Sequence, residues 1–171
     1  MLIYPKLYLN KVEEITYEYL KQKEIKALIL DVDNTLIDYA KNLSPAIIEW
    51  AKDIQEKGIK LHILSNSNKK EKVKTVANKL GIEFEYFAKK PLKIGFKKVQ
   101  KILNMLPENI GVVGDQIFTD IIGGNRCKMF TILVEPINSK DFWFTAWKRP
   151  IEDKIKSKVE KRIEIGDKNV F

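Results

Sequence analysis

The chain has 171 residues and a mass of 19.9 kDa, which fits one domain of ordinary size that needs no disulfide or structural metal to fold. Its formal net charge of +8 favours anionic partners, but only three of its 31 cationic residues are arginines. Because bidentate base reading in DNA favours arginine, this composition argues against sequence-specific nucleic-acid binding. The single cysteine, Cys127, excludes an intramolecular disulfide framework and a cysteine-based zinc site, and it fits a reducing cytoplasm.

The N-terminal nine residues are mostly apolar, but Pro5 and Lys6 interrupt them and no cleavage site of the A-x-A type follows. No run in the chain approaches the roughly 20 apolar residues that a membrane span requires. We therefore expect a cytoplasmic protein.

Five short apolar runs indicate strands, and helical patterns separate them. The runs cover residues 25–30, 59–64, 83–87, 110–113 and 129–134. Between the first two runs, Ser44 as N-cap, Pro45 in the first turn and Gly58 just past the end predict one helix.

The second helix is predicted from an apolar stripe at helical spacing, which consists of Val73, Val76, Ala77 and Leu80. Asn68 followed by Glu71 predicts a capping box at its start, and Gly81 predicts its end. Two more helices are expected, from Pro91 to Met105 and around residues 118–125.

Strands separated by single helices predict an α/β fold, with a parallel sheet of about five strands and helices on both faces. We expect one domain over residues 1–171, with the core motifs in 25–135 and a C-terminal extension in 135–171. Such sheets bind ligands beyond the carboxyl ends of their strands, so the polar residues that follow each strand are the candidates for chemistry.

Four consecutive strand ends carry polar residues. In chain order they are Asp31 and Asp33, then Ser65 and Asn66, then Lys90, then Asp115 and Asp120. A D-x-D pair alone is commonly a turn with solvated carboxylates, because short motifs have many chance matches. If the sheet forms as predicted, however, all of these groups meet in one crevice.

Carboxylates that share a pocket require a cation nearby, because their charges repel one another. Oxygen ligands without histidine or cysteine favour Mg²⁺ over zinc. Asp31, Asp33 and Asp115 are the candidate metal ligands, and Ser65 and Lys90 offer a donor and a positive charge to a phosphoryl group. These groups predict a phosphoryl-transfer centre, which requires little beyond positioning and charge neutralisation.

The ordered motifs D-x-D-N-T-L, S-N, K-P and G-D-Q-x-x-T-D resemble those of the haloacid-dehalogenase-type (HAD) phosphatases. Within that superfamily the chain is most similar to the capless subclass III phosphatases, in the branch of the phosphatidylglycerophosphate phosphatases. The segment 134–155 resembles that branch more loosely, and Lys148-Arg149 stand where the branch has Asn-Arg. The resemblance implies a Rossmann-like sheet with the first three strands side by side and the last two on the other side of the first.

The resemblance also implies a role for each motif position. Asp31 would be the nucleophile that forms an aspartyl-phosphate, and Asp33 would protonate the leaving oxygen and then activate water. The metal site would use the carboxylates of Asp31 and Asp115 and the backbone carbonyl of Asp33, and Asp120 would reach it through water. The phosphate-binding groups would be Ser65, the amide of Asn66, Lys90 and Thr35, with Thr35 also tying the loop together.

The motif spacing leaves no room for a cap domain. Asp31 and Ser65 are 34 positions apart and Ser65 and Lys90 are 25 apart, and one helix and one strand fill nearly all of each interval. An uncovered site admits a large or macromolecular phosphate ester, such as a lipid headgroup at a membrane surface, a nucleic acid or a protein. We therefore expect a Mg²⁺-dependent phosphomonoesterase in the cytoplasm or at the inner face of the membrane, and the resemblance alone implies phosphatidylglycerophosphate as its substrate.

Two alternatives stay open from the sequence. One is a phosphatase of nucleotides, sugar phosphates or nucleic-acid ends. The other is a receiver-like signalling module, which is disfavoured because receivers place their acceptor aspartate after the third strand, where this chain has Ala88-Lys89-Lys90.

Several other residues have ordinary structural interpretations. We interpret His62 as a packed core residue and Cys127 as a small buried hydrophobe. The lysine cluster is interpreted as a solvated helix face and consists of Lys69, Lys70, Lys72 and Lys74. The aromatic segment 142–149 has two interpretations, as core or as a contact with anionic lipid.

Overall fold

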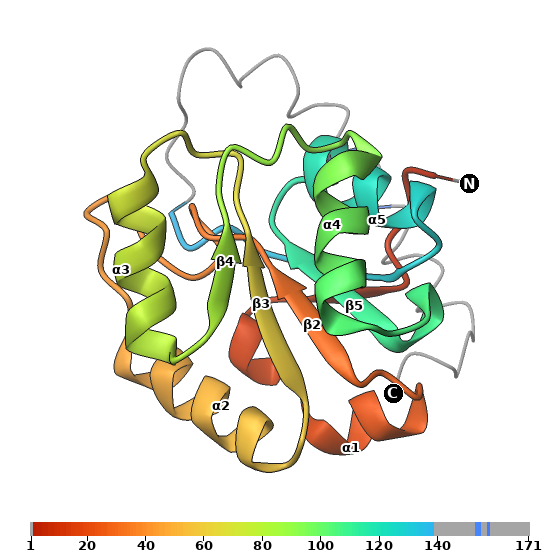
Figure 1. Ribbon diagram of the computed structural model, residues 1–171, viewed down its shortest axis with the longest axis horizontal. Helices are drawn as coiled ribbons and strands as arrows, with labels where there is room; N and C mark the ends of the chain where they lie inside the picture. The colour runs from red at the N-terminus through yellow and green to blue at the C-terminus, as the bar shows by residue number, and fades with distance from the viewer. Residues whose placement is uncertain (1, 139–152, 155–156, 158–171) are drawn as a thin grey trace.

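A parallel β-sheet forms the centre of the computed structural model, which describes residues 2–138, 153–154 and 157 (Figure 1). Within that part of the chain six strands pair in the order β1-β6-β5-β2-β3-β4, and every pairing is parallel. The strands are β1 (Leu7–Leu9), β2 (Ala27–Leu30), β3 (Lys60–Leu64), β4 (Glu83–Glu85), β5 (Ile110–Gly114) and β6 (Phe130–Val134). The five predicted strands correspond to β2–β6 in the predicted order, which confirms the Rossmann-like α/β fold.

Helices cover both faces of this sheet (Figure 1). One face packs against α1 (Tyr17–Gln22), α2 (Pro45–Glu56) and α3 (Lys70–Leu80), and the other against α4 (Lys93–Leu103) and α5 (Ile122–Arg126). In β2, Leu28 and Leu30 join the first core while Ala27 and Ile29 join the second, as expected for side chains that alternate along a strand. Burial on both faces explains why β2, β5 and β6 read as nearly continuous apolar runs.

Helix α2 has the boundaries that its end signals predict. The Ser44 Oγ accepts a hydrogen bond of 3.3 Å from the Ile47 N–H, and Pro45 is the first helical residue. Gly58 follows the helix with φ of 93°, a left-handed conformation that glycine adopts without strain. The residues at its two ends therefore specify where α2 begins and ends, and its apolar stripe specifies its buried side.

Helix α3 ends at Gly81 as predicted, but the predicted capping box at its start is wrong. The N-cap residue is Lys69, which makes no side-chain cap bond. The Ser67 Oγ accepts from the Lys69 N–H at 3.2 Å, and the Ser65 Oγ accepts from the Ser67 N–H at 3.1 Å. The serine hydroxyls therefore organise the turn after β3, and Asn68 caps no helix.

The N-terminal region contains elements that the sequence analysis did not predict. Strand β1 pairs with β6 at the sheet edge, a 3₁₀ turn (Val12–Glu14) follows, and the Thr16 side chain caps α1. The Trp50 Nε1 donates to the Ile15 carbonyl oxygen at 2.9 Å, which joins this region to α2. The N-terminal residues thus belong to the same core as the motifs.

The intervals between the motifs contain no cap. In the fully described stretch between Leu30 and Lys93, the chain forms a loop and α2 before β3, and α3 before β4. None of the helices in the described residues is both long and apolar enough to cross a membrane. The aromatic segment 142–149 lies outside the described residues, as does most of the predicted extension 135–171.

Candidate active site

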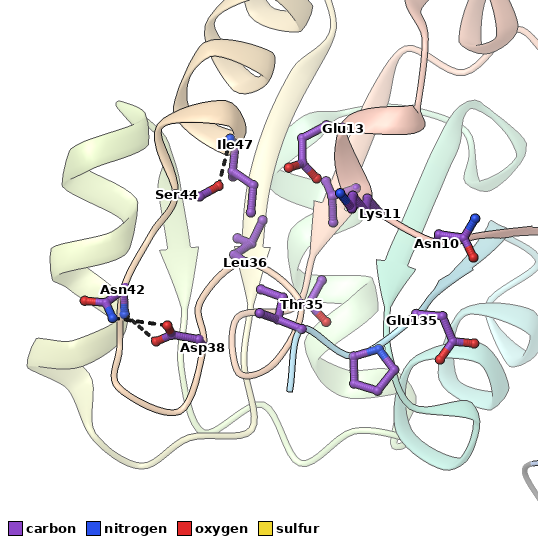
Figure 2. A pocket seen from close by; sticks show the side chains of 13 residues that line it. Asn10, Lys11, Glu13, Thr35, Leu36, Asp38, Asn42, Ser44, Ile47 and Glu135 are labelled. Carbon is purple, nitrogen blue, oxygen red and sulfur yellow. Dashed lines mark hydrogen bonds between the residues drawn. The ribbon is translucent and has the colours of Figure 1, made fainter. Parts of the chain in front are cut away.

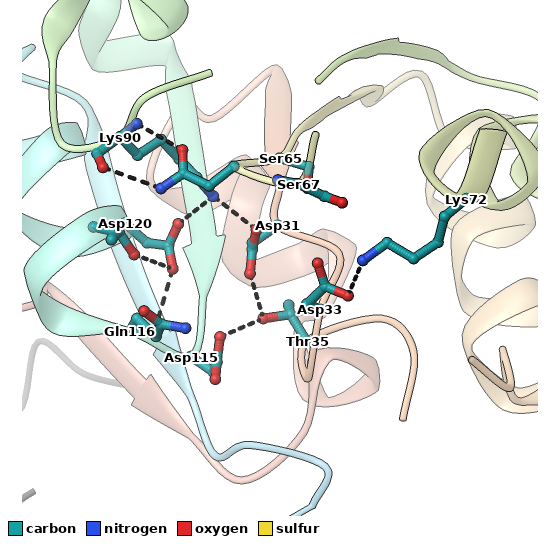
Figure 3. Close-up of polar contacts among 12 residues, drawn as sticks. Asp31, Asp33, Thr35, Ser65, Ser67, Lys72, Lys90, Asp115, Gln116 and Asp120 are labelled. Carbon is teal, nitrogen blue, oxygen red and sulfur yellow. Dashed lines mark hydrogen bonds and ion pairs between the residues drawn. The ribbon is translucent and has the colours of Figure 1, made fainter. Parts of the chain in front are cut away.

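The sequence-predicted site residues meet at the carboxyl edge of the sheet, where neighbouring strands β5, β2 and β3 end. Asp31 follows β2, Ser65 follows β3, and Asp115 follows β5. Lys90 lies in the loop between β4 and α4, and Asp120 lies in the short π-helix (Ile117–Ile121) after β5 (Figure 3). Parallel pairing therefore brings together groups that are up to 89 positions apart in the sequence.

Lys90 is the centre of a buried ionic cluster. Its Nζ donates to the Asp31 Oδ1 at 2.7 Å and to the Asp120 Oδ1 at 2.6 Å (Figure 3). The Lys90 side chain is 3% exposed, and those of its two partners are 10% and 1% exposed. Burial alone would lower the pKa of Lys90, but the charges of Asp120 and Asp31 outweigh burial and raise it above its ordinary value. Lys90 is therefore a fixed cation beside the Asp31 carboxylate.

Thr35 lies between two of the carboxylates. Its hydroxyl is 3.1 Å from the Asp115 Oδ1 and 3.5 Å from the Asp31 Oδ2. Because a hydroxyl has one hydrogen, it donates to one of these oxygens at a time. Thr35 is itself buried, and its hydroxyl links the carboxylates that follow β2 and β5.

Three carboxylates form a cluster that fits a divalent cation. Oxygen atoms of Asp31, Asp115 and Asp120 all lie within 4.8 Å of one another. Burial and the neighbouring carboxylate charges raise the pKa of Asp115 well above its ordinary value. Burial also raises the pKa of Asp120, to about 6, although Lys90 opposes the shift. A hard cation with oxygen ligands would relieve this repulsion, so the donor set fits Mg²⁺ or a similar ion.

The Asp33 carboxylate lies outside that cluster and faces the opposite side of Asp31. It is 51% exposed, and its Oδ1 accepts a hydrogen bond of 2.5 Å from the Lys72 Nζ of α3 (Figure 3). The interpretation of Lys72 as part of a solvated helix face is therefore wrong, since its side chain is only 15% exposed. The two residues are 39 positions apart, and no local pattern in the sequence signals their contact.

Asn66 has a positioning role that the sequence analysis missed. Its Oδ1 accepts from the Lys90 backbone N–H at 2.6 Å, and its Nδ2 donates to the Lys90 carbonyl oxygen at 3.1 Å. Ser65 is fully buried, and its backbone N–H donates to the Glu85 carbonyl oxygen. The Ser65-Asn66 pair thus ties the end of β3 to the Lys90 loop.

The structure explains why two further motif positions carry Gly114 and Asn34. A Cβ atom at Gly114 would lie 2.3 Å from the Asp120 carboxyl, so glycine is required for Asp120 to reach the cluster. Asn34 has φ of 64°, and its side chain both donates to and accepts from the backbone of Asn138. Asn34 therefore joins the turn that follows Asp33 to the chain that follows β6.

A pocket of about 320 Å³ lies beside the loop that follows β2, away from the carboxylate cluster (Figure 2). Thr35, Ser44 and Glu135 are among its lining residues, and Asn10 and Lys11 contribute from the region after β1. None of the clustered carboxylates lines it. We therefore assign the candidate site to the cluster around Lys90.

Comparison with known sequences assigns the family. A family model described as mitochondrial PGP phosphatase matches residues 1–138. The probable phosphatase YqeG of Bacillus subtilis is 38% identical over 159 residues, which cover 92% of each chain. Phosphatidylglycerophosphate phosphatase 1 of Arabidopsis thaliana, described as chloroplastic/mitochondrial, is 30% identical over 148 residues, which cover 80% of this chain and 42% of the plant protein.

Comparison with solved structures supports the fold. An uncharacterized protein from Listeria monocytogenes serotype 4b superimposes with a TM-score of 0.56 and 20% identity, over 69% of this chain and 85% of that one. A HAD-family hydrolase from Streptomyces avermitilis superimposes with a TM-score of 0.51 and 18% identity, over 66% of this chain and 67% of that one. The solved structures thus show that the chain shares its fold with a HAD-family hydrolase, and the sequence matches show that it is a phosphatase and belongs to the mitochondrial PGP phosphatase family.

Proposed function

We propose that the protein hydrolyses the phosphomonoester of phosphatidylglycerophosphate through an aspartyl-phosphate on Asp31. The observation that carries this proposal is the asymmetric surroundings of Asp31. Buried Lys90 and Thr35 hold its two oxygens on one side, and Asp33 lies at the exposed side. A nucleophile, a phosphate-neutralising cation and an accessible acid–base group are what phosphomonoester hydrolysis requires.

In the first half-reaction, an Asp31 oxygen attacks phosphorus and the ester P–O bond breaks. Protonated Asp33 gives its proton to the leaving oxygen, so the alcohol departs neutral. Lys90, Ser65 and the backbone N–H of Asn66 hold the phosphoryl oxygens as their charge develops. In the second half-reaction, ionised Asp33 takes a proton from water, which attacks phosphorus and releases phosphate from Asp31.

The clustered carboxylates fit a role in holding Mg²⁺. Asp31 and Asp115 would bind it directly with the backbone carbonyl of Asp33, and Asp120 would act through water. When bound, the ion supplies positive charge that offsets the carboxylates and the phosphoryl oxygens. Asp120 meanwhile keeps Lys90 in place through the bond of 2.6 Å.

The substrate assignment is supported by the family and by the open site. The Arabidopsis relative is a phosphatidylglycerophosphate phosphatase, and a site without a cap leaves space for a lipid headgroup. We propose that the protein works as a cytoplasmic enzyme at the inner face of the membrane. Three large apolar side chains in the segment that carries Lys90, between β4 and the first turn of α4, support this: Phe87, Leu92 and Ile94 are 55%, 45% and 75% exposed. Lysines lie among them, with the Lys89 Nζ 5.2 Å from the Phe87 ring centre.

A substrate panel tests this proposal. Phosphatidylglycerophosphate in detergent micelles is compared with a nucleoside monophosphate, a sugar phosphate and a DNA 5′-phosphate, each with Mg²⁺ and with EDTA. We expect the lipid to have the highest kcat/KM, and EDTA to abolish its hydrolysis. A higher kcat/KM for one of the soluble esters or for the DNA end would reject the lipid assignment, and undiminished activity in EDTA would reject the metal.

A further inference from the structure

A groove of about 380 Å³ lies between α3 and the loop that follows β2. In Figure 1 this loop passes beside α3. The residues that line the groove are Ile37, Lys41, Leu43, Lys69, Glu71, Lys72, Thr75, Val76 and Lys79. Its helical wall runs from Lys69 to Lys79, which is roughly 15 Å at 1.5 Å per residue.

The groove combines an apolar floor with a cationic rim. Ile37 and Val76 are buried and Leu43 is half-buried, whereas four lysines and a single glutamate carry the charges of the lining. The first turn of α3 adds to the positive potential, because its N-cap residue makes no side-chain bond to the free N–H groups. The lining therefore favours an anionic group attached to a less polar body.

The groove adjoins the proposed acid–base residue, Asp33, through the Lys72 side chain. Lys72 lines it and also donates to the Asp33 carboxylate, which lies between Lys72 and Asp31 (Figure 3). Asp33 also forms a β-bridge with Ile37, which bridges in turn to Leu43. One loop thus carries Asp33 and two residues of the groove floor.

This position relates the groove to one part of the substrate. A general acid must lie next to the oxygen that departs, so the leaving alcohol extends from the Asp33 side of the site. Ser65, Asn66 and Lys90 lie on the opposite side, with the phosphoryl group. The part of a substrate that reaches the groove is therefore its leaving group.

We propose that the groove is a leaving-group subsite that binds a second phosphate carried by the alcohol of the substrate. The proposal rests on the proposed function, because it takes Asp33 as the acid. Lys41, Lys69 and Lys79 bind that phosphate together with Lys72, which joins the subsite to the catalytic acid. In phosphatidylglycerophosphate the leaving alcohol carries a phosphodiester, and a small soluble bisphosphate offers the same chemistry.

The test compares three substrates in the presence of Mg²⁺. Glycerol 3-phosphate has no second phosphate, deacylated phosphatidylglycerophosphate has both phosphates without the lipid, and the intact lipid is supplied in detergent micelles. The measured quantity is the ratio of kcat/KM for each two-phosphate substrate to that for glycerol 3-phosphate. Lys41→Gln/Lys69→Gln/Lys79→Gln removes three groove lysines but leaves Lys72 and the acid–base pair unchanged.

The matched control is Lys60→Gln/Lys74→Gln/Lys101→Gln, which removes the same charge from exposed lysines outside the groove. In the groove variant we expect this ratio of kcat/KM values to fall about tenfold for both two-phosphate substrates, mainly through a higher KM. A loss of this size is what three partly exposed charge contacts would give. The control should keep the wild-type ratio. An equal loss in both variants, no loss in either, or a loss confined to the lipid would each overturn the subsite.

A second measurement needs no catalytic comparison between variants. Glycerophosphoglycerol, which has the phosphodiester but no phosphomonoester, should inhibit wild-type hydrolysis of glycerol 3-phosphate competitively and inhibit the groove variant at least several-fold less. Equal inhibition of the two proteins would overturn the subsite. If the wild-type protein hydrolyses none of the three substrates, the proposed function itself is wrong, which is a different outcome from an unchanged ratio.

Discussion

Two lysine–aspartate contacts lie on opposite sides of the same catalytic loop, and they differ in burial. Lys90 is 3% exposed and bonds Asp31 and Asp120, whereas the Lys72–Asp33 pair has an aspartate that is 51% exposed. The inner contact is one part of a cluster in which the charges of Asp120 and Asp31 raise the pKa of Lys90 against the effect of burial, and burial raises the pKa values of Asp115 and Asp120. The outer contact is open to water and to ions.

This difference in burial suits the Lys90 side and the Lys72 side of the site to different functions. Breaking a buried ion pair leaves an uncompensated charge, so the inner contacts are costly to break and hold their side chains in place. An exposed pair contributes little stability and exchanges partners readily. The inner side is thus suited to hold a phosphoryl group, and the outer side to admit different leaving groups.

The largest effect is expected from a change at Asp31, where the two sides meet. Asp31→Asn should reduce turnover below detection, because the amide is a poor nucleophile and a poor metal ligand. Initial rates with phosphatidylglycerophosphate check this, and circular dichroism verifies that the variant is folded. Turnover close to wild type in the folded variant would disprove nucleophilic attack by Asp31.

The next comparison concerns the two lysines directly. In metal-free buffer Lys90→Met should lower the free energy of unfolding by about 3–5 kcal/mol, because it leaves buried carboxylates unpaired. Lys72→Met should lower it by at most about 1 kcal/mol. Urea unfolding of both variants measures the two values, and similar losses would contradict the contrast between buried and exposed pairs.

A third change separates proton transfer from nucleophilic attack. Asp33→Asn should slow hydrolysis of phosphatidylglycerophosphate by about 10²–10⁴-fold. The first step with p-nitrophenyl phosphate should be much less affected, because its leaving group departs without a proton. Stopped-flow measurement of p-nitrophenol release checks this, and an equal slowing with both esters would remove the acid role of Asp33.

The smallest effect concerns pH and metal. The pKa of Asp120 is raised from 3.8 to about 6, so the folded metal-free protein holds a proton that the unfolded chain has lost. Its stability should therefore fall as pH rises from about 4 to about 6, and Mg²⁺, which binds the ionised carboxylates, should raise Tm more at pH 7.5 than at pH 5. Thermal unfolding with Mg²⁺ and with EDTA measures this. Asp53→Asn, which changes an exposed carboxylate outside the cluster, is the control and should show the same effect of Mg²⁺ as the wild-type protein. An equal rise at both pH values would contradict a metal site at this cluster.

Much of the fold could be predicted because local signals agree with tertiary packing. Helix α2 has an N-cap serine, a first-turn proline and a terminal glycine, and its apolar stripe is its buried side. The strands that carry the motifs are buried on both faces and read as apolar runs. The positions of Asp31, Ser65 and Asp115 then follow from the rule that ligands bind at the carboxyl ends of parallel strands.

Other features could not be predicted because distant contacts determine them. Strand β1 has only three residues and becomes a strand through pairing with β6. The start of α3 depends on serine hydroxyls that bond the turn before it, which outweigh the Asn68–Glu71 spacing. Lys72 sits in a run of lysines, and only the packing of α3 against the catalytic loop distinguishes it from Lys74.

The central claim, that Asp31 carries the phosphoryl group between two half-reactions, has a direct test. Asp33→Asn should form the phosphoenzyme from p-nitrophenyl phosphate but hydrolyse it slowly, because the water-activating base is missing. Rapid quenching with ³²P-labelled ester and peptide mapping should therefore locate a hydroxylamine-sensitive phosphate on Asp31 that accumulates in this variant and is absent from Asp31→Asn. Label on another residue, or full turnover without any labelled protein in either Asp33→Asn or wild type, would contradict the account.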